Sequence, residues 1–167
     1  MKLTTKCDVE AESAFVFREL ADFDGWERAA MRRGAEVVRI NAMSDGGPNG
    51  GSGVVPGVTW ETRFRYDDKA WAVTVRLDRI APDTALALTG TSRLADARIE
   101  IDVMELSGLR TRLLVRLDIK PKTVAARIYV QSLRLVRSRV ERSFAQRVAQ
   151  LGAEIESQQR AARSAGL

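Results

Sequence analysis

The sequence predicts an α+β fold in which an antiparallel sheet of about seven strands is combined with a long C-terminal helix. Residues 35–120 carry one short strand pattern after another, separated by tight turns, and connections this short join antiparallel strands. Residues 123–159 then hold the strongest helical periodicity in the chain. Two shorter helix patterns lie between the first strand and the second.

The first strand is expected at residues 2–9, where apolar and polar side chains alternate with the two-residue period of a half-buried strand. A first short helix is expected from Ser13, whose hydroxyl can cap it, to about Phe23. A second short helix is expected at residues 25–33, and Gly34 suits its C-terminal cap.

Six further strands are expected to complete the sheet, because each segment alternates or runs apolar between turn residues. A tight hairpin is expected at Asp67 and Asp68, and another around Ser107 and Gly108. The six segments are residues 35–42, 57–66, 71–77, 85–92, 96–106 and 109–120.

One continuous C-terminal helix is expected from near Thr123 towards Gln159, because apolar residues recur every three or four positions. The apolar stripe consists of Tyr129, Leu133, Val136, Val140, Phe144, Val148, Leu151 and Ile155. A chain of 167 residues fits a single domain, which we place at residues 1–160. Residues 161–167 are expected to form a disordered tail.

The glycine-rich segment 46–53, GGPNGGSG, does not match a phosphate-binding loop. Such a loop needs a lysine and a Ser or Thr after its last glycine and must open into a helix. Here the next lysine is Lys69, and a strand follows instead. The segment is therefore predicted to be a flexible connection between strands, in which glycine supplies positive φ angles.

The residue content restricts the possible chemistry. The chain has no histidine and a single cysteine, Cys7, which excludes an intramolecular disulfide and a cysteine-based zinc site. Cys7 is expected to be a small buried hydrophobe, because the usual activating base is missing. No catalytic residue, metal or cofactor is assigned. The N-terminus lacks the apolar core of a signal peptide, and a cytoplasmic location is expected.

Positive charge is concentrated at the C-terminus. From Lys122 onward there are nine Lys or Arg and three acids, whereas the rest of the chain is nearly neutral. The arginines on the outer side of the helix spread over a wide arc without an aromatic platform for bases, which favours a solvated face over a nucleic-acid site. Stable membrane insertion is not expected. Apolar residues on the same outer side, Val124, Ile128 and Leu135, suggest either extra coverage by the domain or a homodimer contact.

The order of elements resembles the helix-grip fold of the START-like, or SRPBCC, superfamily. The stretch VEAESAFVFRELADFDGWE, residues 9–27, is similar to the opening of that fold, and GVTWETRFRY with WAVTVRLDRIAPDTALAL is similar to its third to fifth strands. The resemblance covers about residues 2–155. It implies a curved sheet wrapped around the long helix, with a largely apolar cavity between them and residues 46–53 near the cavity mouth.

Candidate ligand-binding residues lie on the sheet face and the helix stripe that should oppose each other. Their aromatic rings can line a pocket or fill the core, and their hydroxyls can meet a ligand or a neighbouring backbone group. Arg137 flanks the stripe, where it can bind an anionic head group, extend to water or pair with an acid of the sheet. The candidates are Trp60, Thr62, Phe64, Tyr66, Trp71, Val73, Val75, Thr111, Tyr129, Leu133, Val136 and Arg137.

The expected function is the binding of an apolar or amphipathic small molecule, such as a lipid, a quinone or a polyketide-like compound, without catalysis. The resemblance also implies two alternatives. One is an enzyme of the cyclase or aromatase type, which would need an ionisable group facing the cavity. The other is an interaction protein whose basic C-terminal helix meets the ribosome, a membrane or a partner chain.

Overall fold

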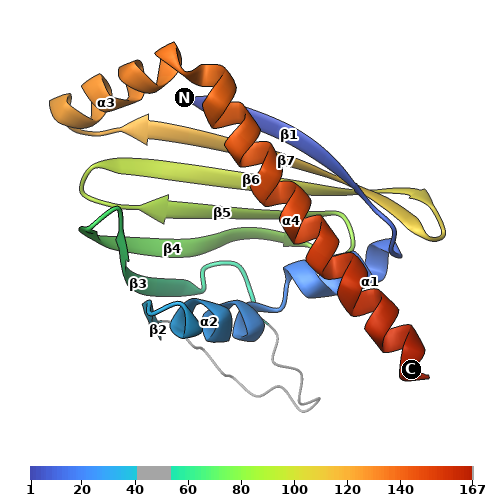
Figure 1. Ribbon diagram of the computed structural model, residues 1–167. Coiled ribbons are helices and arrows are strands. Elements are labelled where there is room, and N and C mark those ends of the chain that lie inside the picture. The colour runs from blue at the N-terminus through green and yellow to red at the C-terminus, as the bar shows by residue number, and fades with distance from the viewer. Residues whose placement is uncertain (41–53, 167) are drawn as a thin grey trace.

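The computed structural model describes residues 1–40 and 54–166, and it confirms the α+β architecture with a seven-stranded antiparallel sheet (Figure 1). The strand order is β1-β7-β6-β5-β4-β3-β2, so consecutive strands from β2 to β7 are neighbours and β1 closes the far edge beside β7. The strands are β1 Lys2–Val9, β2 Glu36–Arg39, β3 Thr59–Tyr66, β4 Lys69–Ala81, β5 Ala85–Thr91, β6 Ala95–Ser107 and β7 Arg110–Pro121.

The register of the strands assembles one apolar face. Trp60 lies opposite Val75 and Thr62 opposite Val73, as the alternation of the two strands predicts. The pairing of β4 with β5 shifts between Leu77 and Arg79, and an irregularity of this kind bends a strand and increases its twist. The sheet is curved, and its concave face carries the helices (Figure 1).

The two short helices are α1, Ser13–Leu20, and α2, Phe23–Arg32. The expectation that Ser13 caps the first helix is wrong, because the N-cap is Glu12 and its side chain makes no capping hydrogen bond. Instead, Asp22 caps α2, and its carboxylate accepts a hydrogen bond of 3.0 Å from the backbone N–H of Gly25.

The predicted single C-terminal helix is two helices, α3 at Val124–Leu135 and α4 at Arg137–Ser164. Helix α4 crosses the concave face diagonally, whereas α3 extends away from it beyond the end of β7 (Figure 1). At the junction the N–H of Val136 bonds to the carbonyl oxygen of Leu133 and not to that of the residue four positions back. Helix α4 also continues to Ser164, beyond the start of the segment expected to be disordered.

The position of α3 leaves its outer side open. Leu135 is 88% exposed, and Val124 and Ile128 are also exposed. These residues are the ones from which the sequence suggests a homodimer contact, and that contact stays a prediction.

The hydrophobic core extends along the concave face, from Trp60 of β3 and Leu86 of β5 to the side where α1 and α4 meet β1, β6 and β7. Val9, Val16 and Leu113 are fully buried there, and α4 contributes Val148 and Ile155. Among the described residues, no helix combines the length and the apolar composition needed to cross a lipid bilayer.

Candidate functional site

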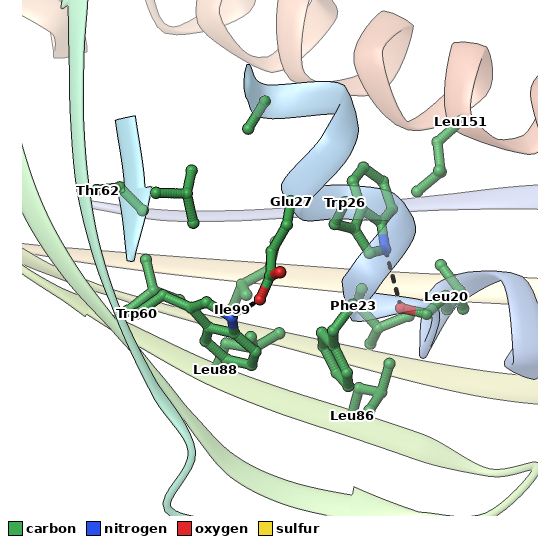
Figure 2. A pocket seen from close by; sticks show the side chains of 14 residues that line it. Leu20, Phe23, Trp26, Glu27, Trp60, Thr62, Leu86, Leu88, Ile99 and Leu151 are labelled. Carbon is green, nitrogen blue, oxygen red and sulfur yellow. Dashed lines mark hydrogen bonds between the residues drawn. The ribbon is translucent and has the colours of Figure 1, made fainter. Parts of the chain in front are cut away.

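An apolar cavity of about 310 Å³ lies beside the core, between α2 and the concave face of the sheet. The sheet supplies its floor from β2 to β6, α2 supplies one wall, and α1 and α4 each contribute a single residue (Figure 2). The described residues that line it are Leu20, Phe23, Trp26, Glu27, Ala30, Val37, Trp60, Thr62, Val75, Leu86, Leu88, Ile99, Ile101 and Leu151.

Helix α2 forms its wall because four of its residues fall on one face. Phe23, Trp26, Glu27 and Ala30 are spaced by three or four positions, the separation at which helical side chains share a side. The ring of Phe23 packs against the ring of Trp60 with their centroids 5.2 Å apart. This contact ties α2 to the sheet at the base of the cavity.

The polar part of the cavity wall is an ion-pair cluster around Glu27. Its Oε1 atom accepts a hydrogen bond of 2.6 Å from Trp60 Nε1 (Figure 2). The same atom accepts one of 2.8 Å from Arg39 Nε. Arg39 also bonds to Asp24 at 2.8 Å, and its guanidinium lies 5.6 Å from the ring centroid of Trp60. These contacts hold Arg39 of β2, Glu27 of α2 and the ring of Trp60 together.

The charge of Arg39 is well stabilised by this cluster. Burial disfavours its charged form, but the hydrogen bonds with Glu27 and Asp24 outweigh burial and raise the pKa of Arg39 above its ordinary value. Arg39 is not among the residues that line the cavity, whereas Glu27 is. The cavity is therefore bordered by a carboxylate, with the matching cation placed behind it.

Three of the predicted ligand-binding residues line this cavity, namely Trp60, Thr62 and Val75. Phe64, Tyr66, Trp71 and Val73 continue the same sheet face towards the β3–β4 hairpin and are not among the lining residues. The sheet is more open there, and Tyr66 is 59% exposed.

The hydroxyls of the two candidate threonines bond to the backbone. Thr62 Oγ1 donates to the carbonyl oxygen of Val73 at 2.8 Å. Thr111 is fully buried and donates to the carbonyl oxygen of Ala11 at 2.8 Å, away from the cavity. Both hydroxyls follow the alternative in which a neighbouring backbone group satisfies them.

The four candidates from the C-terminal helix pattern lie apart from the cavity, because α3 does not cover the sheet. Tyr129 is 65% exposed, Leu133 is half-buried and Val136 is exposed at the junction. Arg137 forms an ion pair of 2.7 Å with Glu141 of the same helix, and its side chain is exposed.

The sequence reasoning missed most of the α2 wall and the contribution of β5 and β6. Residues 85–88 and 99–101 were expected as strands but not as cavity lining. Helical spacing could have pointed to Glu27, because an acid between Phe23 and Ala30 interrupts an otherwise apolar face. The glycine-rich segment 46–53, expected near the cavity mouth, lies outside the described residues.

A second hollow, a groove of about 380 Å³ with mixed charges, runs between α2 and α4. It shares Trp26 and Leu151 with the cavity, so these two side chains separate the groove from the apolar interior. Trp26 is fixed by a hydrogen bond of 3.1 Å from its Nε1 to the carbonyl oxygen of Leu20.

Three solved structures show how widely this architecture is shared. The Zhui aromatase/cyclase from Streptomyces sp. R1128 is 17% identical, with 97% of each chain covered and a TM-score of 0.66. The di-domain aromatase/cyclase StfQ from the steffimycin biosynthetic pathway is 13% identical, with 96% of this chain and 51% of that one covered and a TM-score of 0.65. A START superfamily protein from Mycobacterium smegmatis is 12% identical, with 87% of this chain and 97% of that one covered and a TM-score of 0.54.

No protein-family model matches the sequence, and no curated protein matches it either. The structural matches extend over nearly the whole chain and include the antiparallel sheet and the C-terminal helix. The chain therefore has the START-like fold, also called the helix-grip fold.

Proposed function

We propose that this protein binds an apolar small molecule in the cavity between α2 and the sheet. The observation that carries the proposal is a preformed hollow of about 310 Å³ whose wall is aromatic and aliphatic except at Glu27 and Thr62. Small-molecule sites are typically concave, mostly apolar and about 300–1,000 Å³ in volume, with a few polar groups that orient the ligand. This cavity has that composition and lies at the small end of that range.

The fold supports the same proposal, because two similar structures are described as aromatase/cyclases and a third as a START superfamily protein. Among the described residues that line the cavity, Glu27 is the only ionisable one. A cyclase or aromatase reaction needs an acid–base group that is free to exchange protons with the substrate, whereas Glu27 is hydrogen-bonded to Trp60 and Arg39. We therefore propose binding and not catalysis as the role of the cavity.

The proposal is tested with the neutral fluorescent probe N-phenyl-1-naphthylamine, whose emission rises in apolar surroundings. We expect saturable binding to the wild-type protein. Replacing Ala30 by Phe places a ring in the cavity and should weaken probe binding about tenfold or more, because the ring takes the volume that the probe needs.

The matched control is Ala29→Phe, which adds the same ring to the same helix but on the side of the mixed-charge groove. It should leave probe affinity within about twofold of the wild type. Equal loss of binding in both variants, or no binding to the wild-type protein, would show that the cavity is not the ligand site.

A further inference from the structure

The carboxylate of Glu27 is only partly used by the protein. The hydrogen bonds and the ion pair that the described residues make with Glu27 all reach one oxygen, Oε1. Its side chain is 22% exposed and borders the cavity. Because an ionised carboxylate has two oxygens that accept hydrogen bonds and none that donate, Oε2 can still accept a donor.

The other polar side-chain groups at the cavity are already hydrogen-bonded within the protein. Thr62 Oγ1 donates to the carbonyl oxygen of Val73, and Trp26 Nε1 donates to that of Leu20. Trp60 Nε1 is bonded to Glu27 itself (Figure 2). Among the described lining residues, the strongest free acceptor is therefore the second oxygen of Glu27.

The charges behind the wall do not favour an anionic ligand. Arg39 is the cation of the cluster, but it is held by both Glu27 and Asp24 and does not line the cavity. The cluster of two carboxylates and one guanidinium has a formal charge of −1. A ligand carboxylate placed against Glu27 would meet a like charge in surroundings that screen it poorly.

We propose that the cavity selects an apolar molecule that carries a hydroxyl or phenol group, which donates a hydrogen bond to Oε2 of Glu27, and that it discriminates against carboxylates. This inference rests on the proposed function and narrows its ligand class. A ligand without a donor would displace water from Oε2 and leave a charged acceptor unpaired. A ligand with a donor replaces that water bond, and its apolar body fills the remaining volume.

The test compares three ligands with the same naphthalene ring for their ability to displace N-phenyl-1-naphthylamine at about pH 7. They are 2-naphthol, which has a donor, 2-methoxynaphthalene, which has none, and 2-naphthoate, which is anionic. We expect 2-naphthol to bind about tenfold more tightly than 2-methoxynaphthalene, with 2-naphthoate weakest.

Two variants locate this preference at the carboxylate. In Glu27→Gln the side-chain oxygen can keep its bonds with Trp60 and Arg39, and the amide N–H groups then face the cavity as donors. The advantage of 2-naphthol over 2-methoxynaphthalene should shrink to about twofold or less, and 2-naphthoate should gain affinity. Asp24→Asn neutralises the carboxylate outside the cavity and should preserve the advantage of 2-naphthol.

The outcomes separate this inference from the proposed function. Equal affinities of the three ligands for the wild-type protein, a preference for 2-naphthoate, or displacement of the probe by none of them would overturn the inference, while the probe would still report a binding cavity. A wild-type protein that does not bind the probe would overturn the proposed function and the inference with it. The relative affinities of the three ligands for the wild-type protein test the inference even if Glu27→Gln fails to fold. Circular dichroism would reveal such a failure.

Discussion

Gly152 lies where α4 crosses β1, and its lack of a side chain lets the helix approach the sheet closely. A Cβ atom at this position would lie 2.8 Å from Cys7 Sγ and 3.2 Å from Val9 Cγ2. Burial raises the pKa of the Cys7 thiol, and Glu156 and Asp8 raise it further, which fits the predicted role of Cys7 as a small packed side chain.

We expect Gly152→Ala to lower the free energy of unfolding by about 1 kcal/mol. Alanine gains about 1 kcal/mol from helix propensity, but overpacking against β1 costs about 1–3 kcal/mol. Urea denaturation measures the change. Cys7→Ala in the same chain should relieve the contact, so the double variant should lose less than the sum of the single losses. A more stable Gly152→Ala protein would contradict this close packing.

Single residues also show how much of the site the sequence could predict. Trp60, Thr62 and Val75 were predicted because strand alternation is local and assigns each side chain to a face. Glu27 was not, because its role depends on how α2 docks against Trp60 and Arg39, residues more than a helix length away in the chain. Helical periodicity identifies an apolar face but does not say what that face will meet.

At the scale of elements, the break between α3 and α4 was beyond the reach of the sequence pattern. The apolar spacing continues from Leu133 through Val140, and neither glycine nor proline marks the junction at Val136. Inside α3, the hydroxyl of Ser132 donates to the carbonyl oxygen of Tyr129 at 2.6 Å. Back-bonding of this kind competes with the helix and often bends it. The stripe is thus real, but only its α4 part faces the sheet.

This division of the stripe predicts different costs for two truncations. Val148 in α4 is 6% exposed, and Val148→Ala should lower the free energy of unfolding by about 2 kcal/mol through a lost contact and a cavity. Tyr129 in α3 is 65% exposed, and Tyr129→Ala should change the free energy of unfolding by less than about 0.5 kcal/mol.

Urea denaturation measures both values, and probe titration adds a second comparison. Tyr129→Ala should bind the probe like the wild type, because Tyr129 does not line the cavity. A large loss of stability together with a loss of probe affinity in Tyr129→Ala would instead place α3 over the sheet, as one continuous helix would require.

At the scale of the whole molecule, the antiparallel strands and the long C-terminal helix followed from local patterns, whereas the curved sheet and the apolar cavity were expected only from the family resemblance. That resemblance placed the cavity between the sheet and the long helix, but the structure has it between α2 and the sheet, with only Leu151 contributed by α4. Each strand alternates, and each short turn makes its neighbours antiparallel, so β3 to β7 could be ordered from the sequence. The argument does not reach β2, because residues 40–58 separate it from β3. The hollow depends on the distance between α2 and the sheet, which is set by contacts such as Phe23 with Trp60. Contacts between residues distant in the chain leave no periodic signal.

The convex face of the sheet carries ion pairs between carboxylates and arginines on its strands. The hydrogen bond from Arg112 holds the pKa of Asp8 below its usual value. A hydrogen bond from Arg98 lowers the pKa of Glu100 in the same way. The two carboxylates lie on β1 and β6, and their arginine partners lie on β7 and β6. The ionisation of these carboxylates is therefore linked to the folding of the sheet as a whole.

Two other carboxyls are affected by burial. Burial alone would raise the pKa of Asp78, but hydrogen bonds from Thr89 and Arg76 outweigh it and leave the pKa lowered. Burial raises the pKa of Glu19, with a further contribution from Asp22. Glu19 therefore stabilises the folded protein at low pH and loses this effect as the pH rises through its folded pKa. This pH dependence is the opposite of that of Asp8, Asp78 and Glu100.

The three lowered pKa values give the stability of the molecule a predictable dependence on pH. A carboxyl with a lower pKa in the folded state stabilises the fold above its unfolded pKa of about 4, and this contribution is lost as the pH falls through the folded pKa. The chain has no histidine, so we expect a level free energy of unfolding between about pH 6 and 8 and a decline below about pH 4.

In Asp8→Asn the carboxylate is absent, so the difference in free energy of unfolding from the wild type should be largest near pH 6 and shrink below about pH 4. Urea denaturation, which adds no salt, measures both proteins across this range, and an undiminished difference at about pH 3 would show that Asp8 does not stabilise the fold through its charge.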